Sequence, residues 1–227
     1  MPSETPLSSD FLNYLVSSPL QNGRQPGEAP PIPSLSELSK ELGVSVASLR
    51  EQLEVAEAFG LVEVRPRLGI RRLPYSFFPA VSQSLQYAIR LDRGYFDQFS
   101  DLRNQIEASF WDRAVRLLTS QDHLLLKELM GRAWEKLRGS PVQIPHAEHR
   151  QLHMAIYSRL ENPFVLGVLE AYWEAYEQAG YNIFADYNYL REVWNYHQVM
   201  VDAICTGNYE AGYQALITHK DLLYQRS

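Results

Sequence analysis

Four of the six histidines in this 227-residue chain have a spacing that could bind a metal ion. His149 and His153 are four residues apart on a predicted helix, so their side chains lie on one face of it. His197 and His219 fall inside two further predicted helices. Three helices that face one bundle core could bring four imidazoles onto a divalent cation. An i, i+4 histidine pair is only suggestive, however, and a surface pair or separately hydrogen-bonded core histidines are the commoner explanation. His123 is predicted to be an ordinary surface residue.

The segment from His149 to His153 also has the histidine spacing of zinc peptidases. Those enzymes need a glutamate directly after the first histidine as general base, and this chain has Arg150 there. Four protein ligands would also fill the open position that a catalytic zinc uses. The sequence contains no Ser-His-Asp arrangement, phosphate-binding loop or dinucleotide fingerprint. It therefore predicts a binding protein and not an enzyme.

The region before residue 75 has the element order of a winged helix-turn-helix. Ser34 and Glu37 form a capping box, and Ser45 is a second helix N-cap. The stretch 19–33 holds so many prolines that we expect no regular structure there. The predicted elements are helices at 10–18, 34–42 and 45–59, followed by strands at 61–64 and 70–73.

Two parts of this region could contact DNA. The second helix of a helix-turn-helix enters the major groove, and its first residues face the base edges. Those residues are Ser45, Val46, Ala47, Ser48 and Arg50. The predicted hairpin is rich in arginine and has no acid between Val64 and Leu73; its arginines are Arg65, Arg67, Arg71 and Arg72. Such a hairpin can simply be a solvated turn, but directly after a helix-turn-helix the two form one docking surface.

The region after residue 75 is predicted to be helical almost throughout. Short loops between helices favour an antiparallel all-α bundle. The sequence thus predicts a mainly α protein, with a winged helix-turn-helix DNA-binding domain at 1–75 and an all-helical domain at 76–227. The predicted helices lie near 77–91, 95–118, 120–138, 144–160, 163–178, 188–205 and 208–225.

Composition narrows the class of protein. Apolar residues make up 45% of the chain and charged residues 21%, as in ordinary globular proteins. The net charge of −6 argues against a surface that is basic throughout, although a local basic patch remains possible. The single cysteine, Cys205, excludes an internal disulfide framework. No apolar run approaches the roughly 20 residues of a membrane span, and no signal peptide is recognisable. We therefore expect a cytoplasmic protein without a membrane partner.

Several short motifs together resemble a known family. They are Pro26-Gly27, Ile32-Pro33-Ser34, Leu38-Ser39, Leu42 to Ser45, Leu49-Arg50-Glu51, Leu53, Gly60-Leu61-Val62 and Gly69. This combination resembles the GntR family of bacterial transcription regulators, and the helical half resembles the FCD-type effector domain of the FadR subfamily. The resemblance covers about residues 8–224. It implies a homodimer that binds double-stranded DNA at a two-fold-related operator and responds to a small molecule.

The resemblance also implies a site for each ligand. DNA contacts would come from Ser34, Ser45, Val46, Ala47, Ser48, Arg50, Arg65, Arg67, Gly69 and Arg71. Metal-binding FCD domains have an aspartate and three histidines, and here the matching positions hold His149, His153, His197 and His219. Replacing the carboxylate with a fourth imidazole favours Zn, Ni, Cu or Co over Mn or Mg, and we expect Zn or Ni. Because imidazoles coordinate only when neutral, metal affinity should fall as the pH drops through roughly 6.

An effector pocket is implied beside the metal. In the resembling domains an Arg-x-x-x-Glu pair lies at this pocket, and it corresponds to Arg103 and Glu107. A surface salt bridge is the alternative for such an i, i+4 pair. The arginine suits a carboxylate ligand, because a guanidinium pairs with it bidentately. Tyr157 and Trp194 should line the same cavity or pack beneath it.

Two departures from the family bear on DNA binding. Val46 and Ser36 occupy positions where relatives usually or often have arginine, at sites that contact bases or phosphates. Losing two cations should weaken phosphate-driven affinity and change the sequence that is bound. Two alternatives to a metabolite-controlled regulator follow. The protein could be a metal-responsive sensor, or a ligand-binding protein with weakened DNA binding.

Overall fold

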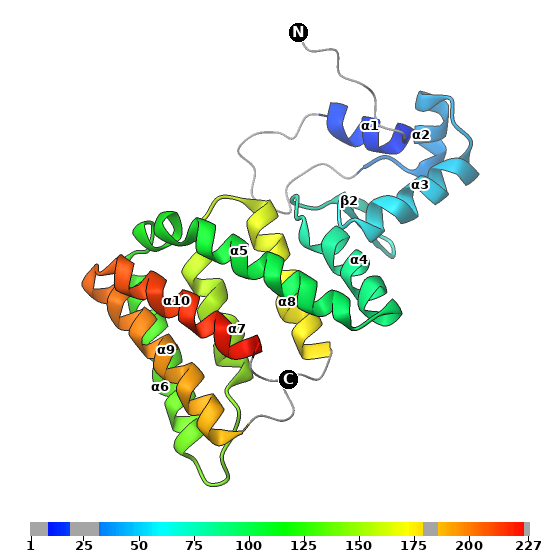
Figure 1. The fold of residues 1–227 in the computed structure, drawn as a ribbon. Helices are drawn as coiled ribbons and strands as arrows, with labels where there is room; N and C mark the ends of the chain where they lie inside the picture. Colours follow the sequence, from blue (N-terminus) through cyan, green and yellow to red (C-terminus); the bar gives the residue numbers. More distant parts are fainter. Residues whose placement is uncertain (1–8, 19–31, 179–185, 225–227) are drawn as a thin grey trace. The chain divides into compact units, whose positions relative to one another are not determined.

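The computed structural model describes residues 9–18, 32–178 and 186–224. The chain forms two compact units, Met1–Ala80 and Val81–Ser227. The described part of the first unit contains α1 (Asp10–Ser17), α2 (Leu35–Leu42), α3 (Val46–Ala58), β1 (Val62–Arg65) and β2 (Gly69–Arg72) (Figure 1). This is the predicted winged helix-turn-helix order. The Pro26-Gly27 motif and most of the stretch 19–33 lie outside the described residues.

Local hydrogen bonds explain where these helices begin and end. The Ser34 hydroxyl accepts from the Glu37 amide, and the Glu37 carboxylate accepts from the Ser34 amide, which confirms the capping box. Gly43 ends α2 in the left-handed conformation, with φ of 69°. Ser45 then caps α3 by accepting from the Ser48 amide. These caps thus fix the turn between the two helices.

The hairpin is antiparallel, with Val62 opposite Arg72 and Arg65 opposite Gly69. Each strand is shifted by one residue from its predicted range, because the ladder closes over the turn at Arg67, whose φ is 65°. Ile32 adds a bridge to Ile70. The core below the hairpin consists of Phe11, Leu15, Leu38, Leu49, Leu53, Ala56, Val62 and Ile70.

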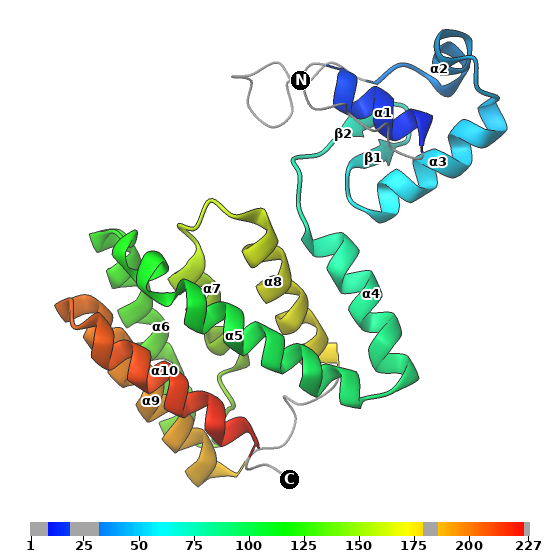
Figure 2. The same ribbon diagram turned by 45° about the horizontal axis from the view of Figure 1, so that its top comes forward.

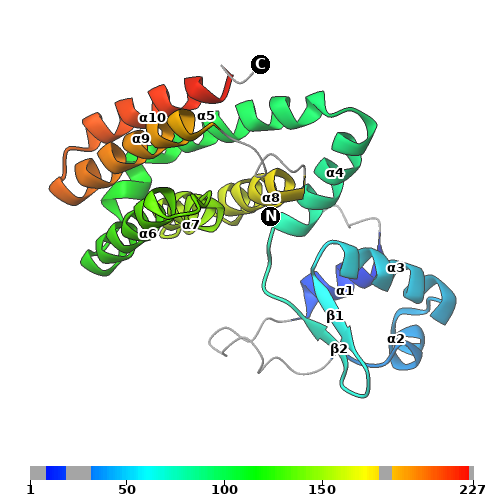
Figure 3. The ribbon, with the colours of Figure 1, turned by 90° about the horizontal axis from the view of Figure 1, so that it is seen from below.

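The second unit is an all-α bundle, as predicted. Helices α9 and α10 lie side by side, α6 packs on α7 and α9, and α5 packs on α7, α8 and α10 (Figures 2 and 3). None of the described helices is long and apolar enough to cross a membrane. Helix α4 (Phe78–Leu91) contains the boundary between the units, and the helices that follow it are α5 (Gly94–Arg116), α6 (Ser120–Arg138), α7 (His146–Tyr157), α8 (Pro163–Gln178), α9 (Tyr187–Thr206) and α10 (Tyr209–Tyr224).

The bounds of α7 show the main deviation from the predicted ranges. The sequence predicted a helix over 144–160, whereas α7 ends at Tyr157. The amide of Leu160 turns back to the Tyr157 carbonyl, and Asn162 caps α8 through the amides of Phe164 and Val165. A tight turn therefore replaces the last predicted residues of the helix.

Candidate metal centre and DNA interface

Four imidazoles converge inside the helical unit. Helix α7 supplies His149 and His153, α9 supplies His197, and α10 supplies His219. One ligand atom from each lies within 4.8 Å of all the others. Three of the side chains are buried, and His149 is half-buried. Of the two explanations left open by spacing, the structure thus shows the clustered arrangement.

Two local features of the chain create this cluster. The i, i+4 spacing places both α7 histidines on one face of the helix, and their ring centroids are 5.1 Å apart. Gly207, with φ of 77°, ends α9 and lets α10 return alongside it. The imidazoles of His197 and His219 consequently lie next to each other, with centroids 4.4 Å apart.

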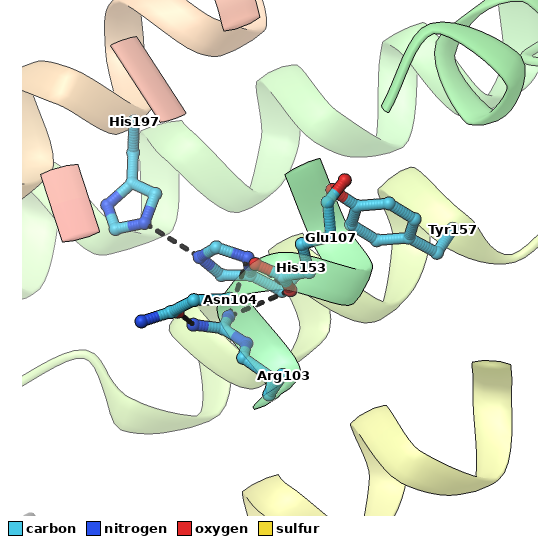
Figure 4. Close-up of polar contacts among 6 residues, drawn as sticks. All are labelled: Arg103, Asn104, Glu107, His153, Tyr157 and His197. Carbon is cyan, nitrogen blue, oxygen red and sulfur yellow. Dashed lines mark hydrogen bonds and ion pairs between the residues drawn. The ribbon is translucent and has the colours of Figure 1, made fainter. Parts of the chain in front are cut away.

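The ring nitrogens meet the requirements of a metal site. Within the described residues, Nε2 of His149, Nδ1 of His197 and both nitrogens of His219 are buried without a hydrogen-bond partner. Burying such polar atoms unpaired is costly. The Nε2 atoms of His153 and His197 are 3.1 Å apart (Figure 4). Two nitrogens bound to one tetrahedral zinc at about 2.0–2.1 Å would lie about 3.3 Å apart, close to the observed distance, so the donor set fits an ion.

Burial keeps these imidazoles neutral. It lowers the pKa of His149, His197 and His219 well below the ordinary value of 6.5, and neighbouring imidazoles add to the shift. The pKa of His153 is also lowered, because burial outweighs the opposing effect of Glu107. Neutral imidazole is the form that coordinates a metal. Proton competition is therefore displaced to a pH below the value near 6 expected from the sequence.

A buried ion pair on α5 lies against the cluster. Nη2 of Arg103 is 2.8 Å from Oε1 of Glu107, with side chains 1% and 0% exposed. The same carboxylate oxygen is 3.0 Å from Nδ1 of His153 (Figure 4). Burial opposes ionisation of Glu107, but the charge of Arg103 and the hydrogen bonds with His153 and Arg103 outweigh it, and the pKa of Glu107 is lowered. The Arg103–Glu107 pair is therefore buried, and it is not the exposed salt bridge that the sequence left as an alternative.

The two aromatic residues predicted beside the pocket are fully buried. The Tyr157 hydroxyl donates to the backbone carbonyl of Glu107 at 2.8 Å. The Trp194 ring lies 4.9 Å from the His197 ring. Both residues belong to the main hydrophobic cluster of the bundle. They contact the candidate site from its core side.

Some of the predicted DNA-contacting residues of the first unit are exposed, and others are half-buried or already hydrogen-bonded. Arg50 and Ala47 are exposed on α3, whereas Val46 and Ser48 are half-buried and the Ser48 hydroxyl accepts from Gln52. The hydroxyls of Ser34 and Ser45, two further residues of the predicted set, are already used as helix caps.

The hairpin arginines also differ in what they bind. Arg67 is exposed at the turn, near the exposed Gly69, and Arg65 pairs with Glu63 at 3.0 Å. Arg71 is half-buried. Arg72, counted among the wing cations in the sequence, donates instead to the carbonyls of Leu15 and Ser18. The wing therefore has fewer available cations than its composition indicates.

Comparisons with known proteins agree with this architecture. The FCD domain family matches residues 98–221 of the chain, which is more than half of it. This chain is a GntR-family transcriptional regulator with an FCD domain. It is 26% identical over 216 residues to YieP, an uncharacterized HTH-type transcriptional regulator of Escherichia coli K12, covering 90% of each chain.

Two further relatives are similar to this regulator. The Uxu operon regulator of Haemophilus influenzae is 26% identical over 143 residues, which are 63% of this chain and 51% of that protein. A solved structure of Streptococcus agalactiae GntR superposes with a TM-score of 0.63 at 18% identity, over 96% of this chain and 97% of that one. The last comparison shows a shared fold. Both curated relatives are named as regulators, which agrees with the binding protein that the sequence predicted.

Some residues of the regulator's candidate site were not foreseen. Tyr172 and Trp173 on α8 lie against the Arg103 guanidinium, at 4.6 and 5.2 Å from the ring centroids. Trp173 also contacts His149, at 4.7 Å between centroids. In the sequence they fall in the predicted helix at 163–178, and no spacing marks them as site residues. His123, expected at the surface, is half-buried, and its Nε2 is buried without a partner among the described residues.

Proposed function

We propose that this regulator controls transcription through a small carboxylate metabolite that binds at a divalent metal in its helical unit. The clustered imidazoles of His149, His153, His197 and His219 are the observation that supports the proposal. We propose that all four hold the ion. A purified sample analysed for metal content, with and without prior chelation, tests this directly.

The chemistry of the donor set supports zinc or nickel. Four neutral nitrogens and no carboxylate form a set that suits Zn, Ni, Cu and Co better than Mn or Mg. All four imidazoles lose affinity for protons through burial, which favours metal binding at neutral pH. Equilibrium dialysis against each ion would rank their affinities.

Arg103 supports a carboxylate as effector. Its guanidinium lies beside the cluster, 2.9 Å from Nδ1 of His153, and its Nε has no hydrogen-bond partner among the described residues. A carboxylate bound near the metal would meet this donor. Glu107, Tyr157 and Trp194 would shape the pocket around it. Calorimetric titration of the metal-loaded protein with small mono- and dicarboxylates tests the assignment.

The DNA partner follows from the family, and we propose that the regulator binds a two-fold-related operator as a homodimer in the cytoplasm. Two-fold dimers bind half-sites about one helical turn, or a multiple of it, apart. The proposed DNA contacts are made by the predicted residues in and next to α2, α3 and the hairpin. Sedimentation measurements with and without operator DNA test the dimer.

A metal-responsive sensor is the second candidate. Four protein nitrogens can complete a tetrahedral site, and in that case the ion itself would be the signal. Operator binding that changes with metal alone supports the sensor, whereas a change that requires the carboxylate supports metabolite control. Weakened DNA binding, suggested by Val46 and Ser36, would appear as low affinity under every condition.

We expect Arg50→Ala to abolish specific operator binding. Arg50 is exposed near the start of α3 and bears no capping role, so its replacement should not unfold the unit. A good arginine–base pair contributes about 1–3 kcal/mol of discrimination, and the proposed homodimer loses one in each half-site, so specific affinity should fall to the level for unrelated DNA. Gel shifts with a genomic fragment selected by the wild type measure this. Unchanged affinity and unchanged competition by unrelated DNA would contradict the docking of α3.

Changing Arg65 and Arg67 together to alanine should weaken binding to every DNA sequence. Wing arginines mainly neutralise phosphates, so the slope of log affinity against log salt should decrease by about 1 for each phosphate that is no longer neutralised. Arg116→Ala is the control for removal of an arginine charge, because Arg116 lies on α5 and pairs with Asp112. A double variant with the wild-type slope would show that the wing does not touch DNA.

A further inference from the structure

We propose that Glu107 is a positioning residue for the metal, and that its carboxylate directs Nε2 of His153 towards the ion. This role rests on the proposed metal site and adds to it a residue that does not itself coordinate. The two side chains are 46 positions apart in sequence and meet through Oε1 and Nδ1 at 3.0 Å. Both are fully buried, so water does not compete for this contact.

The contact selects one tautomer of the imidazole. An ionised carboxylate can only accept a hydrogen bond, so in a hydrogen bond between the two, Nδ1 of His153 carries the proton and donates it to Glu107. Nε2 then keeps its lone pair. That atom is the one that faces His197, at 3.1 Å between the two Nε2 atoms (Figure 4). Partners of this kind fix ring orientation and raise the basicity of a metal-bound histidine.

His153 differs from His197 and His219 in this respect. Within the described residues, Nδ1 of His197 and both nitrogens of His219 have no hydrogen-bond partner. Their rings are oriented by packing against each other and against Trp194 and His149. His153 is therefore the imidazole whose donor atom is already aimed, and the others complete the site around it.

Arg103 holds the carboxylate in place. Its Nη2 is 2.8 Å from Oε1 of Glu107, and its Nη1 donates to the Asn104 side chain at 3.2 Å. The same Nη2 is 2.9 Å from Nδ1 of His153. A guanidinium only donates, so a hydrogen bond along that line would require the opposite tautomer, with the proton on Nε2. In that tautomer Nε2 of His153 would have no lone pair to offer to a metal. Metal binding therefore distinguishes the two tautomers.

The test compares Glu107→Gln with the wild type by competition for Co²⁺ and Zn²⁺ against a chromophoric chelator. Removing a partner that holds a metal ligand typically weakens metal binding 10- to 100-fold, and we expect this range. The Co²⁺ absorption spectrum should also shift, because the orientation of His153 changes. Glu148→Gln is the matched control: it changes another buried carboxylate, which pairs with Lys136 at 2.8 Å outside the cluster, and metal affinity should stay within about twofold.

A second variant excludes a merely structural effect. In a His153→Gln background, Glu107→Gln should cause no further decrease in metal affinity, whereas in a His219→Gln background the decrease should persist. If Glu107→Gln alone unfolds the chain, the Arg103→Met, Glu107→Gln pair removes both buried charges and should show the same weakened binding. Wild-type affinity in Glu107→Gln, or equal decreases in both backgrounds, would overturn the role. A wild type that binds neither ion would overturn the metal site itself.

Discussion

Zinc or nickel should raise the melting temperature of the metal-free protein by roughly 5–10 °C at pH 7.5 when present at a hundredfold excess over its dissociation constant. Binding to the folded state alone stabilises it by about 2.7 kcal/mol at that excess, and about 1 kcal/mol shifts the melting temperature of a chain this size by about 2–4 °C. The ion would join α7 to α9 and α10, which lie side by side. Calorimetric melting after chelation, with each ion then restored, measures the increment.

Single substitutions locate this stabilisation. His197→Ala or His219→Ala should erase the increment, because each removes a buried donor of the cluster. His123→Ala is the control and should retain it, since His123 lies outside the cluster. The comparison uses the increment and not the absolute melting temperature, because His123 is itself half-buried. A wild-type melting curve that neither chelation nor added Zn, Ni, Co or Cu moves at pH 7.5 would exclude the site.

The metal-free protein should lose stability as the pH falls below about 6.5. Unfolded imidazoles take up protons near that pH, whereas the buried ones resist protonation because burial lowers their pKa. The unfolded state then binds more protons, so the free energy of unfolding decreases with decreasing pH. Each such histidine contributes about 1.4 kcal/mol per pH unit between its folded and unfolded pKa. Urea unfolding at pH 7.5, 6.5 and 5.5 with a chelator measures the slope.

Histidine variants show how much each imidazole contributes to the slope of the free energy of unfolding against pH, because the buried carboxylates act in a lower pH range. His197→Gln should flatten it by about 1.4 kcal/mol per pH unit. Asp122 and Glu107 act at lower pH: hydrogen bonds from Arg159 lower the pKa of Asp122, and the pKa of Glu107 is also lowered. The stability they provide is therefore lost only as the pH falls below the ordinary carboxylate range. A slope that is the same in His197→Gln and the wild type would mean that these imidazoles are not buried in neutral form.

Local sequence signals determined the helices and their caps. A capping box depends on residues three positions apart, so Ser34 and Glu37 sufficed to place the start of α2. The spacing of His149 and His153 likewise determined that both side chains share a face of α7. The helical order that identifies the fold class could be predicted for the same reason. These interactions close within one or two helical turns and depend little on the rest of the chain.

The regulator function could be predicted because short motifs of the sequence indicate it. The motifs around α2, α3 and the hairpin predicted a GntR-type regulator, and the family match agrees. The family resemblance indicated a nitrogen donor at His149 in place of a carboxylate, and this stays a prediction. No local pattern, however, could predict whether the four histidines form one cluster or are separately hydrogen-bonded core residues. Both arrangements are compatible with the same helices.

Only the tertiary structure decided which helix faces meet. His153 and His197 are 44 positions apart, and their contact depends on how α7 and α9 are placed in the bundle. The same packing buries Arg103 and Glu107 against His153, although the sequence equally allowed an exposed i, i+4 pair. In the first unit, packing directs Arg72 to the end of α1 and away from the wing surface. Side-chain burial and long-range hydrogen bonds follow from packing that no short segment encodes, which is why the residue types were predictable and their partners were not.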